Sequence, residues 1–159
     1  KDANRSFEYE VFPDILKRKL PFYAYVIDGE YWLDIGTTAT YLKVHHDFLS
    51  GVITGFDTDI RDLAGVATHA EVDRNSVIGD DCTIKPGARV INSVIGPGVL
   101  LEEKAVVENS VIWAHTRVAS AAEIHDAVVG RSCHIGRNAV VGPGSVLGDK
   151  TALTDYTRV

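Results

Sequence analysis

The segment that decides the fold is Asn75–Gly79, which reads NSVIG and returns three times along the chain. It reappears as NSVIG at residues 92–96, as NSVIW at residues 109–113 and as DAVVG at residues 126–130. Each return comes 17 residues after the one before, and one further return, at Leu147, comes after 18. A fixed period of this length indicates a repeat architecture, in which each unit packs mainly on its neighbours.

Each repeat divides into hexads, with one pentad in the 17-residue turns, and two positions in each hexad follow a rule from residue 66 to residue 159. The leading position is always aliphatic: Val66, Val72, Ile78, Ile84, Val90, Ile95, Leu101, Val107, Ile112, Val118, Ile124, Val129, Ile135, Val141, Leu147, Leu153 and Val159. The position two residues earlier, from Ala70 onward, is never larger than Val. Residues two apart share one side of an extended segment, so both positions face the same interior. The pattern predicts a mainly β protein, with a three-sided parallel β-solenoid of about five coils over residues 66–159.

Other residues of the repeat fall at its corners. Glycine follows the aliphatic position at Gly79, Gly96, Gly130, Gly136, Gly142 and Gly148, where we expect tight backbone bends. Asn75, Asn92 and Asn109 share one edge, where asparagine tolerates unusual backbone angles and can form an amide ladder. Trp113 stands where neighbouring repeats have glycine, and we predict that it contacts a second copy of the chain.

Residues 1–65 lack the repeat and are expected to form a small α+β segment. The sequence predicts a short helix over Phe12–Leu20 and a hairpin of residues 22–27 and 30–35 around Asp28-Gly29. A second helix is expected from Thr37 or Thr38 through Ser50, with Gly51 as its stop.

The predicted divisions of the chain are residues 1–51, a linker or cap over 52–65, and the solenoid over 66–159. The first of these carries many aromatic residues and too few elements to bury them, so we expect them to pack on the solenoid or on protein outside this chain. These residues are Phe7, Tyr9, Phe12, Phe22, Tyr23, Tyr25, Tyr31 and Trp32.

Composition excludes two broad classes of function. The chain has 159 residues, with 16 Lys and Arg against 22 Asp and Glu, and this acidic balance argues against nucleic-acid binding. No apolar run approaches the roughly 20 residues that a membrane helix needs. The sequence contains no Met and starts at Lys1, so we expect a piece of a longer protein or a processed form.

Three segments carry a family resemblance: SFEYEVFP at residues 6–13, YWLDIGT at residues 31–37 and Tyr41-Leu42. Together with the downstream solenoid, they resemble the end of the catalytic domain of sugar-1-phosphate nucleotidyltransferases, most closely the mannose-1-phosphate guanylyltransferase branch. The resemblance covers nearly the whole chain in order, and it implies a left-handed β-helix preceded by the end of a Rossmann-like domain. Thr38 departs from the family, which usually has Pro there.

The resemblance implies that Asp34 is one of two aspartates that hold Mg2+ at the reacting phosphates, and that Trp32 lies near the sugar. The spacing of the residues alone favours Asp34 as a strand-end residue that caps the turn before Gly36, and the resemblance reverses this preference. Trp32 could equally be a core residue. The glycine-rich phosphate loop, the basic residues that grip the triphosphate and the first metal aspartate have no match in this sequence. We therefore expect that this chain alone is inactive, and that the parent enzyme uses NTP and a sugar 1-phosphate to make a nucleotide sugar such as GDP-mannose.

Two alternatives to this function remain open. One is a non-catalytic regulatory paralogue of the same family. The other is a hexapeptide acyltransferase that uses a His between subunits, although the repeat places His69, His115, His125 and His134 on different faces or coils. In each case the solenoid is expected to form homo-oligomers.

Cys82 and Cys133 both occupy the small inward position, three coils apart. Stacked strands rise by about 4.8 Å per coil, so the two thiols should be roughly 14 Å apart, too far for a disulfide. We expect buried, unreactive thiols and a cytoplasmic protein.

Overall fold

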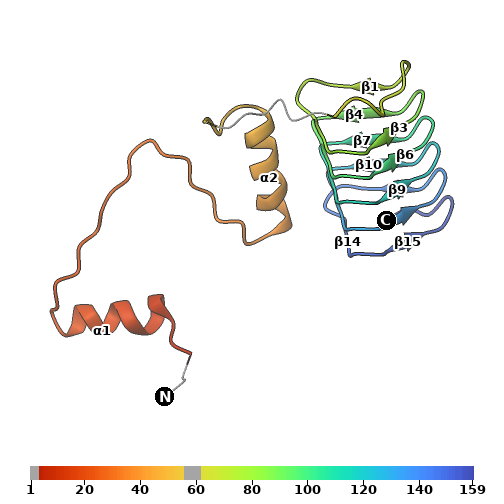
Figure 1. Ribbon diagram of the computed structural model, residues 1–159. Helices are drawn as coiled ribbons and strands as arrows, with labels where there is room; N and C mark the ends of the chain where they lie inside the picture. The colour runs from red at the N-terminus through yellow and green to blue at the C-terminus, as the bar shows by residue number, and fades with distance from the viewer. Residues whose placement is uncertain (1–3, 56–61) are drawn as a thin grey trace. The chain divides into compact units, whose positions relative to one another are not determined.

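The computed structural model describes residues 4–55 and 62–159, and the chain divides into two compact units, with the boundary between Trp32 and Leu33. In the second unit, fifteen short strands of the described residues wind into three parallel sheets of five strands each (Figure 1). These sheets are the three sides of a β-solenoid, as predicted. Among the described residues, no helix has the length and apolar character needed to cross a membrane.

Each turn of the chain adds one strand to every side of the solenoid. The first side contains β1 (Glu71–Val72), β4 (Arg89–Ile91), β7 (Val106–Glu108), β10 (Glu123–His125) and β13 (Val140–Val141). The second side contains β2 (Val77–Ile78), β5 (Val94–Ile95), β8 (Val111–Ile112), β11 (Val128–Val129) and β14 (Val146–Leu147). The third side contains β3 (Thr83–Ile84), β6 (Leu100–Leu101), β9 (Arg117–Val118), β12 (His134–Ile135) and β15 (Ala152–Leu153).

The strand register confirms the period read from the sequence. On the second side Val77 pairs with Val94, Val94 with Val111 and Val111 with Val128, each 17 residues further on. Val128 then pairs with Val146, a step of 18, and steps of 18 also occur at the ends of the other two sides.

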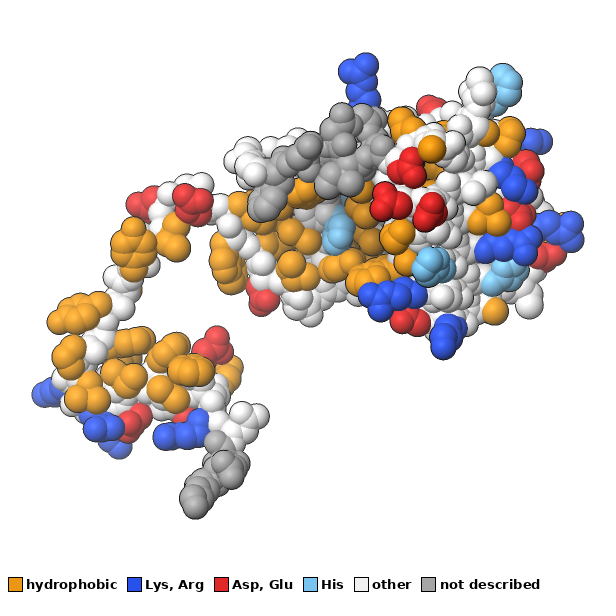
Figure 2. All heavy atoms as spheres, in the orientation of Figure 1, with side chains coloured by type: hydrophobic (Ala, Val, Ile, Leu, Met, Phe, Trp, Pro, Cys, Tyr) orange, Lys and Arg blue, Asp and Glu red, His pale blue; other side chains and the backbone are white. Residues whose placement is uncertain are grey.

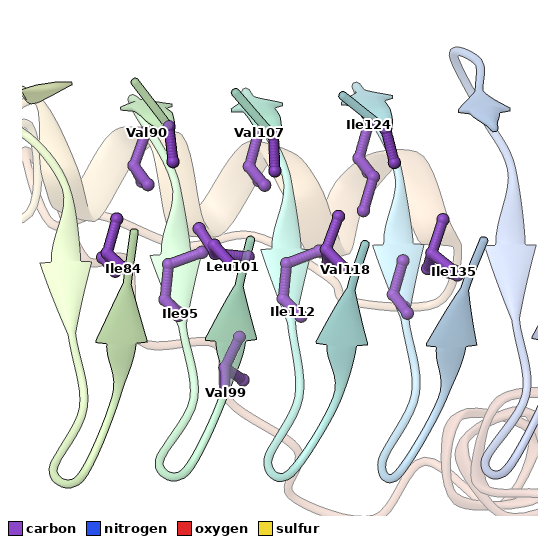
Figure 3. Packing of buried hydrophobic residues seen from close by; sticks show 14 of the residues in the cluster. Ile84, Val90, Ile95, Val99, Leu101, Val107, Ile112, Val118, Ile124 and Ile135 are labelled. Atoms are coloured by element: carbon purple, nitrogen blue, oxygen red, sulfur yellow. The ribbon is translucent and has the colours of Figure 1, made fainter. Parts of the chain in front are cut away.

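The two-position rule describes the core of the solenoid. Every leading position from Ile78 to Val141 is buried, and so is every small position from Ser76 to Ala139. The buried aliphatic side chains point into one continuous interior along the stack of coils (Figure 3). The core loosens towards the last coil, where Leu147 and Leu153 are partly buried and Val159 is 50% exposed.

Serine is tolerated inside this core because its hydroxyl is fully used. The hydroxyls of Ser76, Ser93 and Ser110 each accept a backbone N–H from the residue 17 further on, at 3.1 Å. The hydroxyls of Ser93 and Ser110 also donate to carbonyl oxygens at 2.7 Å. Buried polar groups need such partners, so the serine ladder costs the core little.

The corner glycines have a different role from the one predicted. They do not adopt the left-handed backbone; that conformation occurs instead at residues such as Asp81 and Lys104. A Cβ at Gly79 would lie 2.8 Å from the backbone nitrogen of Pro97, and one at Gly96 would lie 2.8 Å from that of Ala114. At Gly79 and Gly96, glycine is therefore required by the close approach of the next coil and not by the bend itself.

The predicted asparagine ladder forms, but it begins one coil later than expected. Asn92 and Asn109 have φ values of 46° and 49°, and the Asn92 amide donates to the Asn109 amide oxygen at 2.9 Å. In the first coil the Asp73 carboxylate accepts the Asn92 backbone N–H at 3.0 Å. Asp73 thus takes the place that the sequence assigned to Asn75.

Cys82 and Cys133 are free and buried, as predicted. The Cys82 thiol lies 3.1 Å from the Gly96 carbonyl oxygen, and the Cys133 thiol lies 3.2 Å from that of Gly148. Burial raises the pKa of the Cys82 thiol, which keeps it protonated and unreactive.

The first unit is helical at its start. A π-helix, η1 (Phe7–Val11), leads directly into α1 (Phe12–Lys17), and the Ser6 hydroxyl accepts the Tyr9 N–H at the beginning. The predicted helix over Phe12–Leu20 is therefore confirmed in its first two thirds. It ends where Lys19 adopts a left-handed φ of 53°.

The predicted hairpin around Asp28-Gly29 is wrong for this chain. Gly29 has the φ of +83° that a hairpin turn requires, yet residues 22–27 and 30–35 form no strand in the structure. A two-stranded hairpin is only marginally stable in water without a sheet or helix to pack on. Tyr23 and Tyr25 are about 90% exposed, and hydrophobic side chains are conspicuous on this unit (Figure 2).

The divisions expected at residues 51 and 65 remain a prediction. Residues 56–61 of the expected linker lie outside the described residues.

A buried carboxylate joins two coils on the third side. Glu102 is only 8% exposed, and its carboxylate accepts the Arg117 Nε–H at 2.8 Å and the Ser120 backbone N–H at 3.1 Å. Burial acts to raise the pKa of Glu102, but the hydrogen bonds from Arg117 and Ser120 outweigh it, so the pKa lies below its ordinary value. The carboxylate is therefore stabilised in its charged form.

We expect Glu102 to make the unfolding free energy depend on pH in acid. Because its folded pKa is depressed, its stabilisation is present above the unfolded pKa of about 4.3 and is lost as the pH falls through the folded value. Glu102→Gln should remove about 1–3 kcal/mol at pH 7 and much less below pH 4, as measured by urea unfolding across the range. The exposed neighbour provides the control, since Glu103→Gln should change the profile less. Equal profiles for the two variants would contradict the assignment.

Candidate functional site

The second side of the solenoid presents a single residue type to the outside. Its outward positions are Val77, Val94, Val111, Val128 and Val146. The corresponding positions on the first side are mixed and partly charged: Glu71, Arg89, Val106, Glu123 and Val140. We call the five outward valines the valine face. The sequence analysis missed it, although the residue between the small and the aliphatic position is Val in all five coils.

Helix α2 (Thr38–Leu49) lies along the valine face. Its C-terminal half and the first coils line a groove of about 300 Å³: Val44, His45, Phe48, Ile53, Val77 and Val94. Its first turn and the later coils line another of about 400 Å³, whose residues include Gly36, Thr37, Tyr41, Trp113, Val128 and Val146. A 12-residue helix is about 18 Å long, and five coils span about 19 Å. Helix α2 therefore runs the length of the face, in the direction opposite to the stacking of the coils.

The start of α2 is held by a reciprocal cap. The Thr37 hydroxyl accepts the Thr40 N–H at 3.1 Å, and the Thr40 hydroxyl accepts the Thr37 N–H at 3.1 Å. The helix ends at Leu49, with Gly51 at φ +77°. Both ends agree with the prediction, and the cap fixes the direction in which the chain enters the helix.

Trp113 is a solenoid residue that lies beside the first turn of α2. Its ring lies under the Arg131 guanidinium, whose carbon is 4.7 Å from the ring centroid. Burial raises the pKa of the Tyr41 hydroxyl, and a hydrogen bond with the Trp113 side chain partly opposes this rise. Trp113 thus links helix α2 to the solenoid; its predicted contact with a second copy remains a prediction.

Asp34 lies three residues before the cap, in the same unit as α2 and the solenoid. Its side chain is exposed and folds back over Gly36, where an added Cβ would lie 3.7 Å from a carboxylate oxygen. Gly36 itself lines the groove that contains Trp113. Trp32, the other predicted site residue, ends the first unit and is 82% exposed.

Asp34 can supply part of a magnesium site. A carboxylate is the ligand that Mg2+ prefers from protein, and the exposed carboxylate of Asp34 is accessible to an ion from solution. Across residues 4–55 and 62–159, however, no group of three His, Cys, Asp or Glu side chains is placed to hold a metal ion. The described chain therefore fits the ion at one ligand position, and the other ligands would come from elsewhere.

The solenoid histidines do not gather at one place. His69, His115 and His134 are exposed, whereas His125 is half-buried between Glu108 at 3.3 Å and Glu123 at 3.4 Å. On helix α2, His45 lies in the groove beside Val77 and Val94, and His46 faces a groove lined by Asp126 and Gly144. The two adjacent histidines thus point in different directions.

Comparison with known proteins places this fold in a family. The family described as the EIF2B subunit epsilon LbH domain matches residues 60–159, a range that includes the whole solenoid. The chain belongs to this family. Its solenoid is accordingly a left-handed parallel β-helix, as the resemblance implied.

Two enzymes are also similar to this LbH-domain chain. UTP–glucose-1-phosphate uridylyltransferase from Synechocystis sp. is 30% identical over 141 residues, which cover 78% of this chain and 35% of the relative. Mannose-1-phosphate guanylyltransferase from Mycobacterium tuberculosis is 33% identical over 105 residues, covering 61% of this chain and 29% of the relative. The resemblance to sugar-1-phosphate nucleotidyltransferases is thereby confirmed, and the chain spans about a third of their length.

Proposed function

We propose that this chain is the C-terminal part of a nucleotidyltransferase that makes a nucleotide sugar, with GDP-mannose as the leading product. The observation that carries the proposal is the likeness to two such enzymes, which covers 78% of this chain for one and 61% for the other. In this reaction an oxygen of the sugar phosphate attacks the α-phosphorus of the NTP, and pyrophosphate leaves. The reactants are both anions, so a cation at the phosphates lowers the barrier.

In this proposal Asp34 is one ligand of a Mg2+ ion, and Trp32 lies on the sugar side of the pocket. Two observations support the role of Asp34. Its side chain is exposed, and it lies beside Gly36, just before the capped start of α2. The aromatic residues of the first unit are exposed, which supports a surface that covers them in the full-length protein. We assign that surface to the part of the catalytic domain that carries the phosphate loop. Burial of these aromatic side chains against the catalytic domain would remove the unfavourable exposure of apolar surface to water.

We further propose a cytoplasmic homo-oligomer assembled through the β-helix.

The proposal is tested with the full-length protein. We expect pyrophosphate release when it is supplied with Mg2+, GTP and mannose 1-phosphate, with mass spectrometry to identify the nucleotide sugar. Parallel reactions with UTP and glucose 1-phosphate decide between the two specificities named by the relatives. The 159-residue chain alone should show no turnover above background.

Two outcomes would overturn the proposal. A full-length protein that turns over no pair of NTP and sugar 1-phosphate would favour the regulatory paralogue. Acyl transfer from acyl-CoA by the β-helix alone would favour the acyltransferase.

A further inference from the structure

Trp113 occupies a position that the repeat reserves for glycine. The equivalent residues in the coils on either side are Gly96 and Gly130. An added Cβ would come within 2.8 Å of backbone at Gly96 and within 2.7 Å at Gly130. The stacking of coils thus favours no side chain at this corner, so the solenoid itself does not explain a tryptophan there.

Trp113 lies against the first turn of α2 as well as against its own solenoid. Its indole lines the same grooves as Tyr41, and the carbon of the Arg131 guanidinium lies 4.7 Å from the centroid of its ring. Trp113 shares a groove with Gly36 and Thr37. The cation–π contact with Arg131 favours one orientation of the indole ring, so Tyr41 lies beside a fixed aromatic surface.

Tyr41 connects Trp113 to the segment before helix α2. It lies one turn after Thr37, and its backbone N–H donates to the Thr37 carbonyl at 2.9 Å. Thr37 is in turn locked to Thr40 by the reciprocal cap. Thr37 is three positions after Asp34, and a chain of that length spans at most about 10 Å.

We propose that Trp113 is a positioning residue, which anchors the first turn of α2 to the β-helix and thereby holds Asp34 in place. This inference rests on the proposed function for the role of Asp34, but the anchor itself does not depend on it. Through this anchor, the β-helix would influence the position of the proposed metal ligand Asp34. Outer-shell partners of metal ligands commonly change metal affinity by about 10–100-fold when they are removed.

The test variant is Trp113→Gly, which restores the residue of the neighbouring coils and should leave the solenoid folded. Hydrogen–deuterium exchange of the full-length protein should show about tenfold faster exchange over residues 36–42, equal to about 1.4 kcal/mol of local stability. The strands β8 and β11 should exchange as before. Trp113→Phe, which keeps a ring without the N–H, should restore part of the protection.

The link to Asp34 is measured by titration of Mg2+ into the same proteins. Trp113→Gly should bind Mg2+ about tenfold more weakly by calorimetry, and saturating Mg2+ should restore most of kcat. Unchanged exchange over residues 36–42 would overturn the anchor, whatever the enzyme activity. Faster exchange with unchanged Mg2+ affinity would overturn the influence on the metal site. Absence of transferase activity in the wild-type protein would count against the proposed function and leave the exchange result to decide the anchor.

Discussion

Replacement of Asp34 by alanine in the full-length protein is expected to lower nucleotidyl transfer on the order of 100-fold or more. The proposed role of Asp34 is to hold Mg2+ where the negative charge of two phosphates must be brought together. A metal ion in that position contributes several kcal/mol to transition-state stabilisation, and each 1.36 kcal/mol is a factor of ten in rate. The measurement is kcat at saturating Mg2+, from pyrophosphate release.

Two further variants make this result specific. Asp34→Glu keeps a carboxylate and should retain more activity than Asp34→Ala, with a weaker response to Mg2+. Asp28→Ala is the matched control, because Asp28 is also an exposed aspartate before a glycine but lies outside the YWLDIGT segment. It should keep nearly wild-type turnover. Wild-type turnover in Asp34→Ala would refute the metal assignment.

Replacement of Leu101 by alanine is expected to destabilise the β-helix by about 2–5 kcal/mol, the range for leucine-to-alanine changes in a packed core. Leu101 is completely buried in strand β6, at a leading position of the second coil. Because coils pack only on their neighbours, the loss should weaken both flanking coils as well. The measurement is the urea concentration at the midpoint of unfolding for the wild-type and variant proteins. It reports stability when the dependence of the unfolding free energy on urea is the same for both.

The adjacent residue gives an unusually close control. Leu100 belongs to the same two-residue strand but is only half-buried, on the outer face. Leu100→Ala removes the same atoms from the neighbouring residue and should cost less than about 1 kcal/mol. Losses of similar size for the two variants would mean that the inward and outward positions have been reversed.

Most of the solenoid could be predicted from the sequence because its structure is set by local repetition. The same two positions meet the same surroundings in every coil, so seventeen residues of pattern define ninety-four residues of fold. Leu101 and Leu100 illustrate this, since the two-position rule alone says which of them is inside. The capped helix from Thr38 to Leu49 was equally predictable, because a cap is formed by residues close in sequence.

The predictions from sequence were wrong where the local structure depends on contacts with residues far away in the chain. The segment around Gly29 has the turn chemistry of a hairpin, but a hairpin needs a surface to pack on, and no local pattern says whether one is present. The corner glycines were assigned to bends, whereas the backbone of the next coil is what excludes a side chain at Gly79. In the same way, Asp73 displaced Asn75 from the ladder through a contact with the following coil.

The sequence by itself determined the coil: its period, its inward residues and the three sides that follow from them. Only the tertiary structure decided which side helix α2 covers, and that Trp113 meets Tyr41 at the start of that helix. The physical reason is the range of the interactions. Coil formation depends on residues that recur every 17 positions, so its pattern repeats in the sequence, whereas the docking of α2 is a single event between surfaces that leaves no repeat.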